Sequence, residues 1–233
     1  MIRAGALAGG TAVVIDLLRA STTICYALGA GAERVVPVLE VEDALRARSS
    51  LGVRGVVLGG ERGGKHIDGF DLGNSPSEYT SERVGGKTVV FTTTNGTRAA
   101  LACKDAATVL VGCFANLTSV AESALATEAD VHLVCAGTGG AIAMEDCLFA
   151  GALARRLVEQ GMRQGNDESL LTVGAWSFAA AMPGGLDHAL RSAQGGRNLS
   201  GLGMDADIAV CATVDASPVT PRMDARGAFV LVT

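Results

Sequence analysis

The chain has 233 residues, of which 48% are hydrophobic, so it can bury one large core, and this length is ordinary for a single α/β domain. Its formal net charge of −5 argues against a general nucleic-acid binder, because the phosphate backbone of nucleic acid attracts basic surfaces. No apolar run approaches about 18 residues, and residues 1–10 lack the apolar segment of a signal peptide. We therefore expect neither a membrane span nor secretion.

The first two thirds of the chain alternate between apolar, strand-like runs and helix-like stretches. The expected strands cover residues 12–16, 34–38, 55–58, 88–91, 108–111 and 131–135. The expected helices cover residues 22–28, 42–49, 118–126 and 143–160, and another begins at residue 99; a long loop covers residues 59–79. Short apolar strands that alternate with helices predict an α/β fold whose sheet is largely parallel or mixed and covered on both faces.

The alternation weakens after Gly161. We expect a helix over residues 170–181, a break at residues 182–185, short helices over residues 188–192 and 205–212, and a last strand over residues 229–232. The sequence has no low-complexity linker and no internal repeat. It therefore predicts one domain over residues 1–233, with a more helical C-terminal portion.

The six cysteines lie mostly inside apolar runs, and none of them forms a C-x-x-C pair. Buried, reduced thiols explain this pattern better than disulfides or a zinc site do. The three histidines also lack the spacing of metal ligands. We therefore expect a cytoplasmic protein.

Polar side chains follow five of the six expected strands. They are, in chain order, Asp16, Arg19, Ser21 and Thr22; Glu61 and Arg62; Thr93, Thr94, Asn95, Gly96, Thr97 and Arg98; Asn116; and Glu145 and Asp146. Ligands of open α/β sheets bind outside the carboxyl ends of the strands. We therefore expect these groups to share one pocket.

The segment Thr92–Arg98 stands between a strand and a helix. Backbone N–H groups at a helix N-terminus favour an anion, and a guanidinium such as that of Arg98 suits phosphate or carboxylate. A helix-capping turn rich in hydroxyl and amide groups is the alternative, and the segment alone does not separate the two interpretations.

Two nucleotide-binding motifs are incomplete. The segment Gly59-x-x-x-x-Gly64-Lys65 is followed by His66, where a phosphate-binding P-loop has Ser or Thr, and then by a loop in place of a helix. The Gly137-Thr138-Gly139 turn has Ile142 where a dinucleotide fingerprint has its third glycine. The first motif is rejected, and the second leaves a dinucleotide-binding oxidoreductase as an alternative function.

Carboxylates near the strand ends are candidate metal ligands. Asp16 closes an apolar strand, where a carboxylate either caps the next turn or binds a metal ion. Glu145 and Asp146 begin an expected helix, where acids also favour the helix dipole. Adjacent helical residues point about 100° apart, so we expect one of the two to face the pocket. Glu61, between glycines, is a further candidate.

Several segments, in order along nearly the whole chain, resemble the 2-phosphosulfolactate phosphatases. They are Asp16-x-x-Arg19-Ala20-Ser21-Thr22-Thr23, Gly60-Glu61-Arg62-Gly63-Gly64, Gly69-Phe70-Asp71-Leu72-Gly73-Asn74-Ser75-Pro76, Thr93-Thr94-Asn95-Gly96-Thr97-Arg98, Cys135-Ala136-Gly137, Glu145-Asp146 with Ala150-Gly151, and Asn198-Leu199-x-x-Leu202-Gly203-x-x-x-Asp207-Ile208. One departure is Lys65-His66-Ile67-Asp68, where the family pattern has a proline near Asp68.

The resemblance implies a three-layer α/β/α fold and a Mg²⁺-dependent phosphatase that hydrolyses 2-phosphosulfolactate, a step associated with coenzyme M synthesis in methanogens. Another phosphorylated 2-hydroxy acid is an alternative substrate. We expect Asp16, Glu145 and Asp146 to bind the metal ion, and Asp16, Arg19, Glu61 and Arg98 to serve catalysis. The expected substrate-binding residues are Ser21, Thr22, Arg62, Asn74, Ser75, Thr93, Thr94, Asn95, Gly96, Thr97 and Asn116. Direct attack by water and a phosphoenzyme on Asp16 or Ser21 both remain open, as does assembly into a homo-oligomer.

Overall fold

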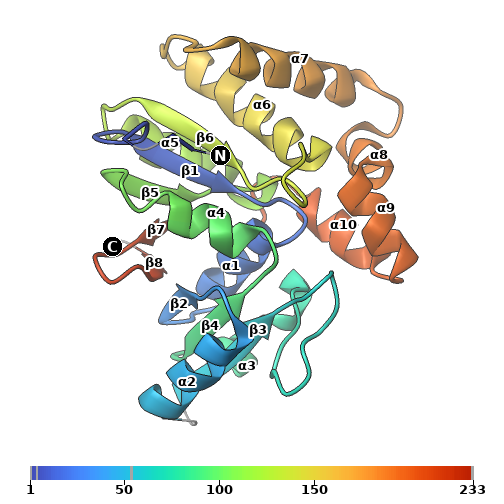
Figure 1. Cartoon of the computed structure of the whole chain (residues 1–233). Coiled ribbons are helices and arrows are strands. Elements are labelled where there is room, and N and C mark those ends of the chain that lie inside the picture. Colours follow the sequence, from blue (N-terminus) through green and yellow to red (C-terminus); the bar gives the residue numbers. More distant parts are fainter. Residues whose placement is uncertain (1, 4, 53–54, 232–233) are drawn as a thin grey trace.

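The computed structural model describes residues 2–3, 5–52 and 55–231, and the described part contains one eight-stranded mixed sheet (Figure 1). The strand order is β3-β4-β2-β8-β7-β5-β1-β6. The strands are β1 (Thr11–Ile15), β2 (Arg34–Pro37), β3 (Val56–Gly60), β4 (Thr88–Thr92), β5 (Thr108–Val111), β6 (Val131–Cys135), β7 (Pro221–Met223) and β8 (Phe229–Leu231). The predicted α/β class with a mixed sheet is confirmed.

The sheet consists of two parallel blocks, β3-β4-β2 and β5-β1-β6. A short hairpin, β7–β8, joins them, and it is antiparallel to both neighbours. Each junction has a single registered pair, Val35 with Phe229 on one side and Leu110 with Arg222 on the other. The three successive antiparallel pairings mean that the two blocks are not one continuous parallel sheet.

Helices pack against the sheet, and two of them contact strands of both blocks. The helices are α1 (Ala20–Gly29), α2 (Val41–Leu51), α3 (Ser81–Val84), α4 (Gly96–Ala102), α5 (Leu117–Leu125), α6 (Met144–Glu159), α7 (Asp167–Ala181), α8 (Gly185–Ser192), α9 (Gln194–Gly201) and α10 (Asp205–Cys211), with 3₁₀ turns η2 (Pro76–Glu78) and η3 (Phe114–Asn116). Helix α4 contacts both β1 and β2, and α1 contacts both β2 and β5. These two helices therefore link the blocks (Figure 1).

The C-terminal helices differ most from the sequence-based expectation. Helix α9 was not predicted, because Gly195, Gly196 and Gly201 have low helix propensity. Helix α8 begins at Gly185, inside the predicted break. The short strand β7 was also missed, because a proline and an arginine in three residues give no strand pattern. The predicted last strand is β8, and Val232 lies outside the described residues.

Core packing fixes the strand that carries the site. All five residues of β1 are buried. On α6, Gly151 lets α7 come close, because a Cβ there would lie 2.0 Å from the backbone oxygen of Thr172. The ring centroids of Trp176 on α7 and Phe114 lie 5.4 Å apart, with the two rings tilted by 36°.

Among the helices of the described ranges, none combines the length and apolar character needed to span a bilayer. One domain over residues 1–233 stays a prediction.

Candidate active site

Asp16 lies directly after β1, and its carboxylate faces the N-terminal residues of two helices. The backbone N–H groups of Ala20 and Gly96, which begin α1 and α4, donate toward its carboxylate and lower its pKa. Desolvation outweighs them and, together with the charges of Glu61 and Glu145, raises the pKa of Asp16 from 3.8 to about 7. Asp16 is therefore buried close to two other carboxylates, whose charges add to the cost of its own ionisation.

Gly96 is required where α4 meets Asp16. A Cβ at this position would lie 2.6 Å from Oδ2 of Asp16 and 2.7 Å from Cβ of Ala20. A glycine therefore allows the end of β1 and the start of α4 to touch, although the two come from different blocks of the sheet. Two of the five segments that were expected to share a pocket therefore meet here, and the shared pocket itself stays a prediction.

Glu145 and Asp146, in the first turn of α6, differ in how their carboxylate oxygens are hydrogen-bonded. Asp146 accepts from the backbone N–H of Leu17 through Oδ1 and of Gly137 through Oδ2, both at 2.9 Å. Burial first, and the charge of Asp16 next, raise the pKa of Asp146 well above its usual range. Asp146 thus holds the ends of β1 and β6 together.

Glu145 is 3% exposed, and its Oε2 has no hydrogen-bond partner among the described residues. A buried carboxylate oxygen without a partner is costly unless a ligand completes it. The sequence predicted that one of the two acids would face the pocket, and the hydrogen bonds distinguish Glu145 as the one with free coordination capacity.

Glu61 connects the ends of β3 and β4. Its Oε1 accepts from the backbone N–H of Thr94 at 2.7 Å, and its Oε2 accepts from the N–H of Gly64 at 2.6 Å and from the hydroxyl of Thr94 at 3.2 Å. Arg62 donates to Oγ1 of Thr92 at 2.8 Å. Glu61 is 7% exposed, so it stabilises two loops from inside.

The Thr92–Arg98 turn is held by its own hydroxyls. The N–H of Thr93 donates to Oγ1 of Thr97 at 3.0 Å, and the N–H of Thr97 donates to Oγ1 of Thr93 at 3.1 Å. Both threonines are buried, whereas Thr94 and Arg98 are exposed and Asn95 is half-buried. The hydroxyl of Thr93 thus accepts an N–H group from the first turn of α4, although the N-cap residue, Asn95, makes no side-chain capping hydrogen bond. Phosphoryl binding by this turn stays a prediction.

Arg19 is buried and paired with an acid that the sequence did not single out as a site residue. Its Nη1 lies 2.6 Å from Oδ2 of Asp207 on α10, and its Nη2 donates to the backbone oxygen of Gly64 at 3.0 Å. The hydroxyl of Ser75 donates to Oδ1 of Asp207 at 2.6 Å. The signal available in the sequence was the helix acid in the segment shared with the family.

Three of the other four predicted residues, Ser21, Thr22 and Asn116, have local hydrogen-bond partners. The hydroxyl of Ser21 accepts from the N–H of Asp16, and that of Thr22 donates to the oxygen of Leu17. Asn116 uses its amide at the β5 end, where it bonds Cys113, Val111 and Val219. Oδ1 of Asn74 is buried without a partner in the described part of the chain. Substrate contacts by all four stay predictions.

A preformed metal cage is absent from the described ranges, where no three His, Cys, Asp or Glu side chains group closely enough to hold an ion. The carboxylates of Asp16 and Glu145 nevertheless fit a divalent cation, because burial, with the charges of Glu61 and Glu145, raises the pKa of Asp16, and Glu145 has an unpartnered oxygen. A bound cation would stabilise the buried charge of Asp16 and offset its repulsion by the other two carboxylates.

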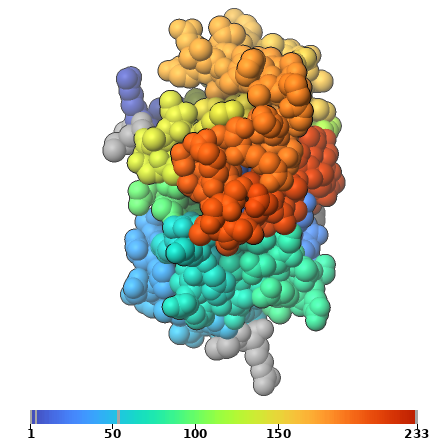
Figure 2. Space-filling model, turned by 90° about the vertical axis from the view of Figure 1, so that its right-hand side faces the viewer, coloured from blue at the N-terminus to red at the C-terminus, as the bar shows by residue number. Residues whose placement is uncertain are grey.

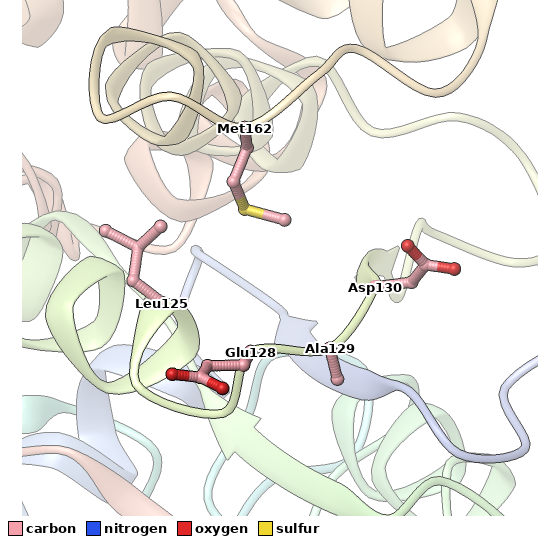
Figure 3. A pocket seen from close by; sticks show the side chains of 5 residues that line it. All are labelled: Leu125, Glu128, Ala129, Asp130 and Met162. Carbon is pink, nitrogen blue, oxygen red and sulfur yellow. The ribbon is translucent and has the colours of Figure 1, made fainter.

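Figure 3 shows a hollow at the other end of the sheet, lined by Leu125, Glu128, Ala129, Asp130 and Met162. Asp130 directly precedes β6, so the hollow lies at the amino end of that strand. Ligands of α/β sheets bind at the carboxyl ends, where Asp16 and Glu145 lie. The hollow is therefore not part of the site.

Comparison with known proteins shows the family of the chain. A family model described as 2-phosphosulpholactate phosphatase matches residues 2–226. The chain belongs to this family. A probable 2-phosphosulfolactate phosphatase of Caldanaerobacter subterraneus subsp. tengcongensis is 38% identical, over 91% of this chain and 86% of its own length. Proteins of the same name from Thermotoga petrophila (38% identical; 95% and 92% covered) and Synechococcus sp. strain CC9605 (41%; 90% and 87%) are similar to it as well.

Family membership also bears on the dinucleotide alternative. The N–H of Gly137, which a dinucleotide phosphate would need, donates to Asp146. The turn at Thr138 and Ala141 closes on itself by a pair of backbone hydrogen bonds. Nothing in the described part of this turn supports an oxidoreductase.

Proposed function

We propose that this protein hydrolyses 2-phosphosulfolactate to sulfolactate and phosphate, with Mg²⁺ held by Asp16 and Glu145. The observation that carries the proposal is the buried, unpartnered Oε2 of Glu145, whose charge, after burial and Glu61, contributes to the raised pKa of Asp16. Family membership supports the phosphatase reaction. The relatives' printed names supply the substrate.

The reaction breaks the ester P–O bond, forms a new P–O bond to water, and returns a proton to the leaving alkoxide. When bound, Mg²⁺ would supply positive charge against the phosphoryl oxygens. The exposed Arg98 and Lys65 and the N-terminal turn of α4 supply further positive potential for a substrate of about four negative charges. Asp146 and Glu61 hold the loops that carry these groups.

Two assays test the proposal. Purified protein should release phosphate from 2-phosphosulfolactate, should lose this activity in EDTA, and should regain it on addition of Mg²⁺. Absence of release from 2-phosphosulfolactate, with release from another phosphorylated 2-hydroxy acid, would change the substrate but keep the reaction class. Rapid-quench labelling separates the two routes, because stable protein-bound phosphate would replace direct water attack by a phosphoenzyme on Asp16 or Ser21.

We also propose a homo-oligomer and a cytoplasmic location. Leu171 and Phe178 of α7 are 73% and 71% exposed on an outer helix, which supports a covered face in the assembled protein (Figure 1). Light scattering should show an oligomer that Leu171→Glu weakens, whereas Leu51→Glu, on exposed α2, leaves it intact. All six cysteines are free, which supports a reducing compartment.

A further inference from the structure

The C-terminal helices reach the site from the far end of the chain. Figure 2 shows residues of α8, α9 and α10, in orange to red, across the face between α6 and the loop that follows β3. Two of the contacts between these helices and the candidate active site are made by Asp207 of α10 and Gly195 of α9.

Asp207 binds two groups from different parts of the site. Its two carboxylate oxygens each take one partner at 2.6 Å, Nη1 of Arg19 on one and the hydroxyl of Ser75 on the other. Asp207 is 5% exposed and Arg19 is 3% exposed. Charge-assisted hydrogen bonds are strong where water is excluded. Asp207 therefore fixes the guanidinium of Arg19, after β1, relative to Ser75 in the loop after β3.

Gly195 leaves the space that Glu145 occupies. A Cβ at residue 195 would lie 2.0 Å from Oε1 and 2.8 Å from the carboxyl carbon of Glu145. Gly195 stands in the first turn of α9 with an ordinary helical backbone, so neither turn geometry nor a positive φ explains the glycine. Its absence of a side chain matters because it determines where the unpartnered carboxylate of Glu145 lies.

We propose that α9 and α10 position the catalytic groups of this site: Asp207 holds Arg19 and Ser75, and Gly195 keeps Glu145 in the place from which it binds metal. Asp207 and Gly195 are thus positioning residues and touch no substrate. This inference rests on the proposed phosphatase function and goes beyond it, because it assigns the C-terminal helices a part in catalysis.

The Asp207 contact is tested by Asp207→Asn and Asp207→Glu. We expect Asn to lower kcat/KM about 10- to 100-fold, and Glu, which keeps the charge, to retain more activity than Asn. The matched control is Asp205→Asn, two residues earlier on α10, where the exposed carboxylate binds Arg191 and Ser200 away from the site. Asp205→Asn should leave kcat and KM unchanged.

The Gly195 contact is tested by Gly195→Ala, with Gly201→Ala as the control in the same helix. A Cβ at Gly201 meets no atom within 4 Å. Both changes raise helix propensity, so neither should lower the melting temperature through the helix itself. We expect Gly195→Ala alone to weaken Mn²⁺ binding about tenfold in calorimetry, and to raise the metal concentration needed for half-maximal activity.

The outcomes separate this inference from the proposed function. A wild-type protein that hydrolyses 2-phosphosulfolactate, with Asp207→Asn and Gly195→Ala equal to their controls, would overturn the inference alone. A wild-type protein that binds Mn²⁺ but hydrolyses no phosphomonoester would overturn the proposed function, and the Mn²⁺ affinity of Gly195→Ala would still decide this inference. If Asp207→Asn does not fold, Asp207→Glu and Gly195→Ala carry the test.

Discussion

The ends of the two parallel blocks differ in how their polar groups are satisfied. At the end of β1 and the start of α6, Asp16 and Glu145 raise each other's electrostatic energy, and one oxygen of Glu145 has no partner within the described structure. At the ends of β3 and β4, Glu61 and Thr97 accept backbone N–H groups. The first region has the unsatisfied carboxylate for which we propose a cation, and the second is held by its own hydrogen bonds.

Replacing Asp16 by Asn should have the largest effect. We expect kcat/KM to fall at least about 100-fold and Mg²⁺ affinity to fall with it, because the variant loses the charge that meets the cation. Steady-state kinetics and calorimetry measure both. Asp105→Asn, an exposed acid, is the control. Unchanged metal affinity in Asp16→Asn would remove the distinction between the two regions.

The metal-free protein should lose stability as pH rises toward 7. The folded-state pKa of Asp16, about 7, is above its unfolded value of 3.8, so the folded state binds the proton more tightly between these values. The contribution of Asp16 to the free energy of unfolding is then fully present below about pH 4. It is lost as the pH rises through about 7, and the loss is about 2 kcal/mol after allowance for partial exposure. Chemical denaturation between pH 5 and 8 measures this. Asp16→Asn and saturating Mg²⁺ should each flatten this pH profile. A stability that rises toward pH 7 in the unsubstituted, metal-free protein would contradict the prediction.

Arg98→Ala should raise KM about tenfold without a change in melting temperature. The side chain is exposed, so its loss removes positive charge from the substrate region and leaves the fold intact. Arg163→Ala, exposed and distant in the chain, provides the comparison. An equal KM for the two variants would confine the anion site to backbone groups.

Thr97→Val should show the smallest effect, a loss of about 1 kcal/mol in unfolding free energy, because the buried N–H of Thr93 loses its acceptor. Denaturant titration against Thr213→Val, an exposed helix-end threonine, measures the difference. Equal stability of the two variants would show that the second region does not depend on its internal hydrogen bonds.

The sequence predicted the strands of both blocks to within one or two residues, because short apolar runs such as Thr108–Val111 stand out between polar turns. It also predicted that Asp16 meets the Thr92–Arg98 turn, but for an incomplete reason. The expectation was that five strand ends of a largely parallel or mixed sheet lie along one edge. In the structure, three antiparallel pairings separate the two blocks, and α1 and α4 bring the ends of the blocks together. Helix packing of this kind leaves no local signal in the sequence.

The individual roles of the site residues could not be predicted from the sequence as well as the strands could. Glu145 and Asp146 are neighbours of the same type, and only tertiary hydrogen bonds show that Asp146 is satisfied and Glu145 is not. The partner of Arg19 lies 188 residues away, so no spacing rule connects them. Helix α9 was hidden because the glycine that accommodates Glu145 also weakens the helix pattern.

The β7–β8 hairpin has a consequence for the order of folding. It follows every strand that it joins in the chain, and it meets each block through one registered pair. Each block can pair its own strands first, but the eight-stranded sheet closes only when residues 221–231 arrive between β2 and β5. We therefore expect the hairpin to pair last. Folding intermediates should then protect both blocks from hydrogen exchange while the hairpin still exchanges.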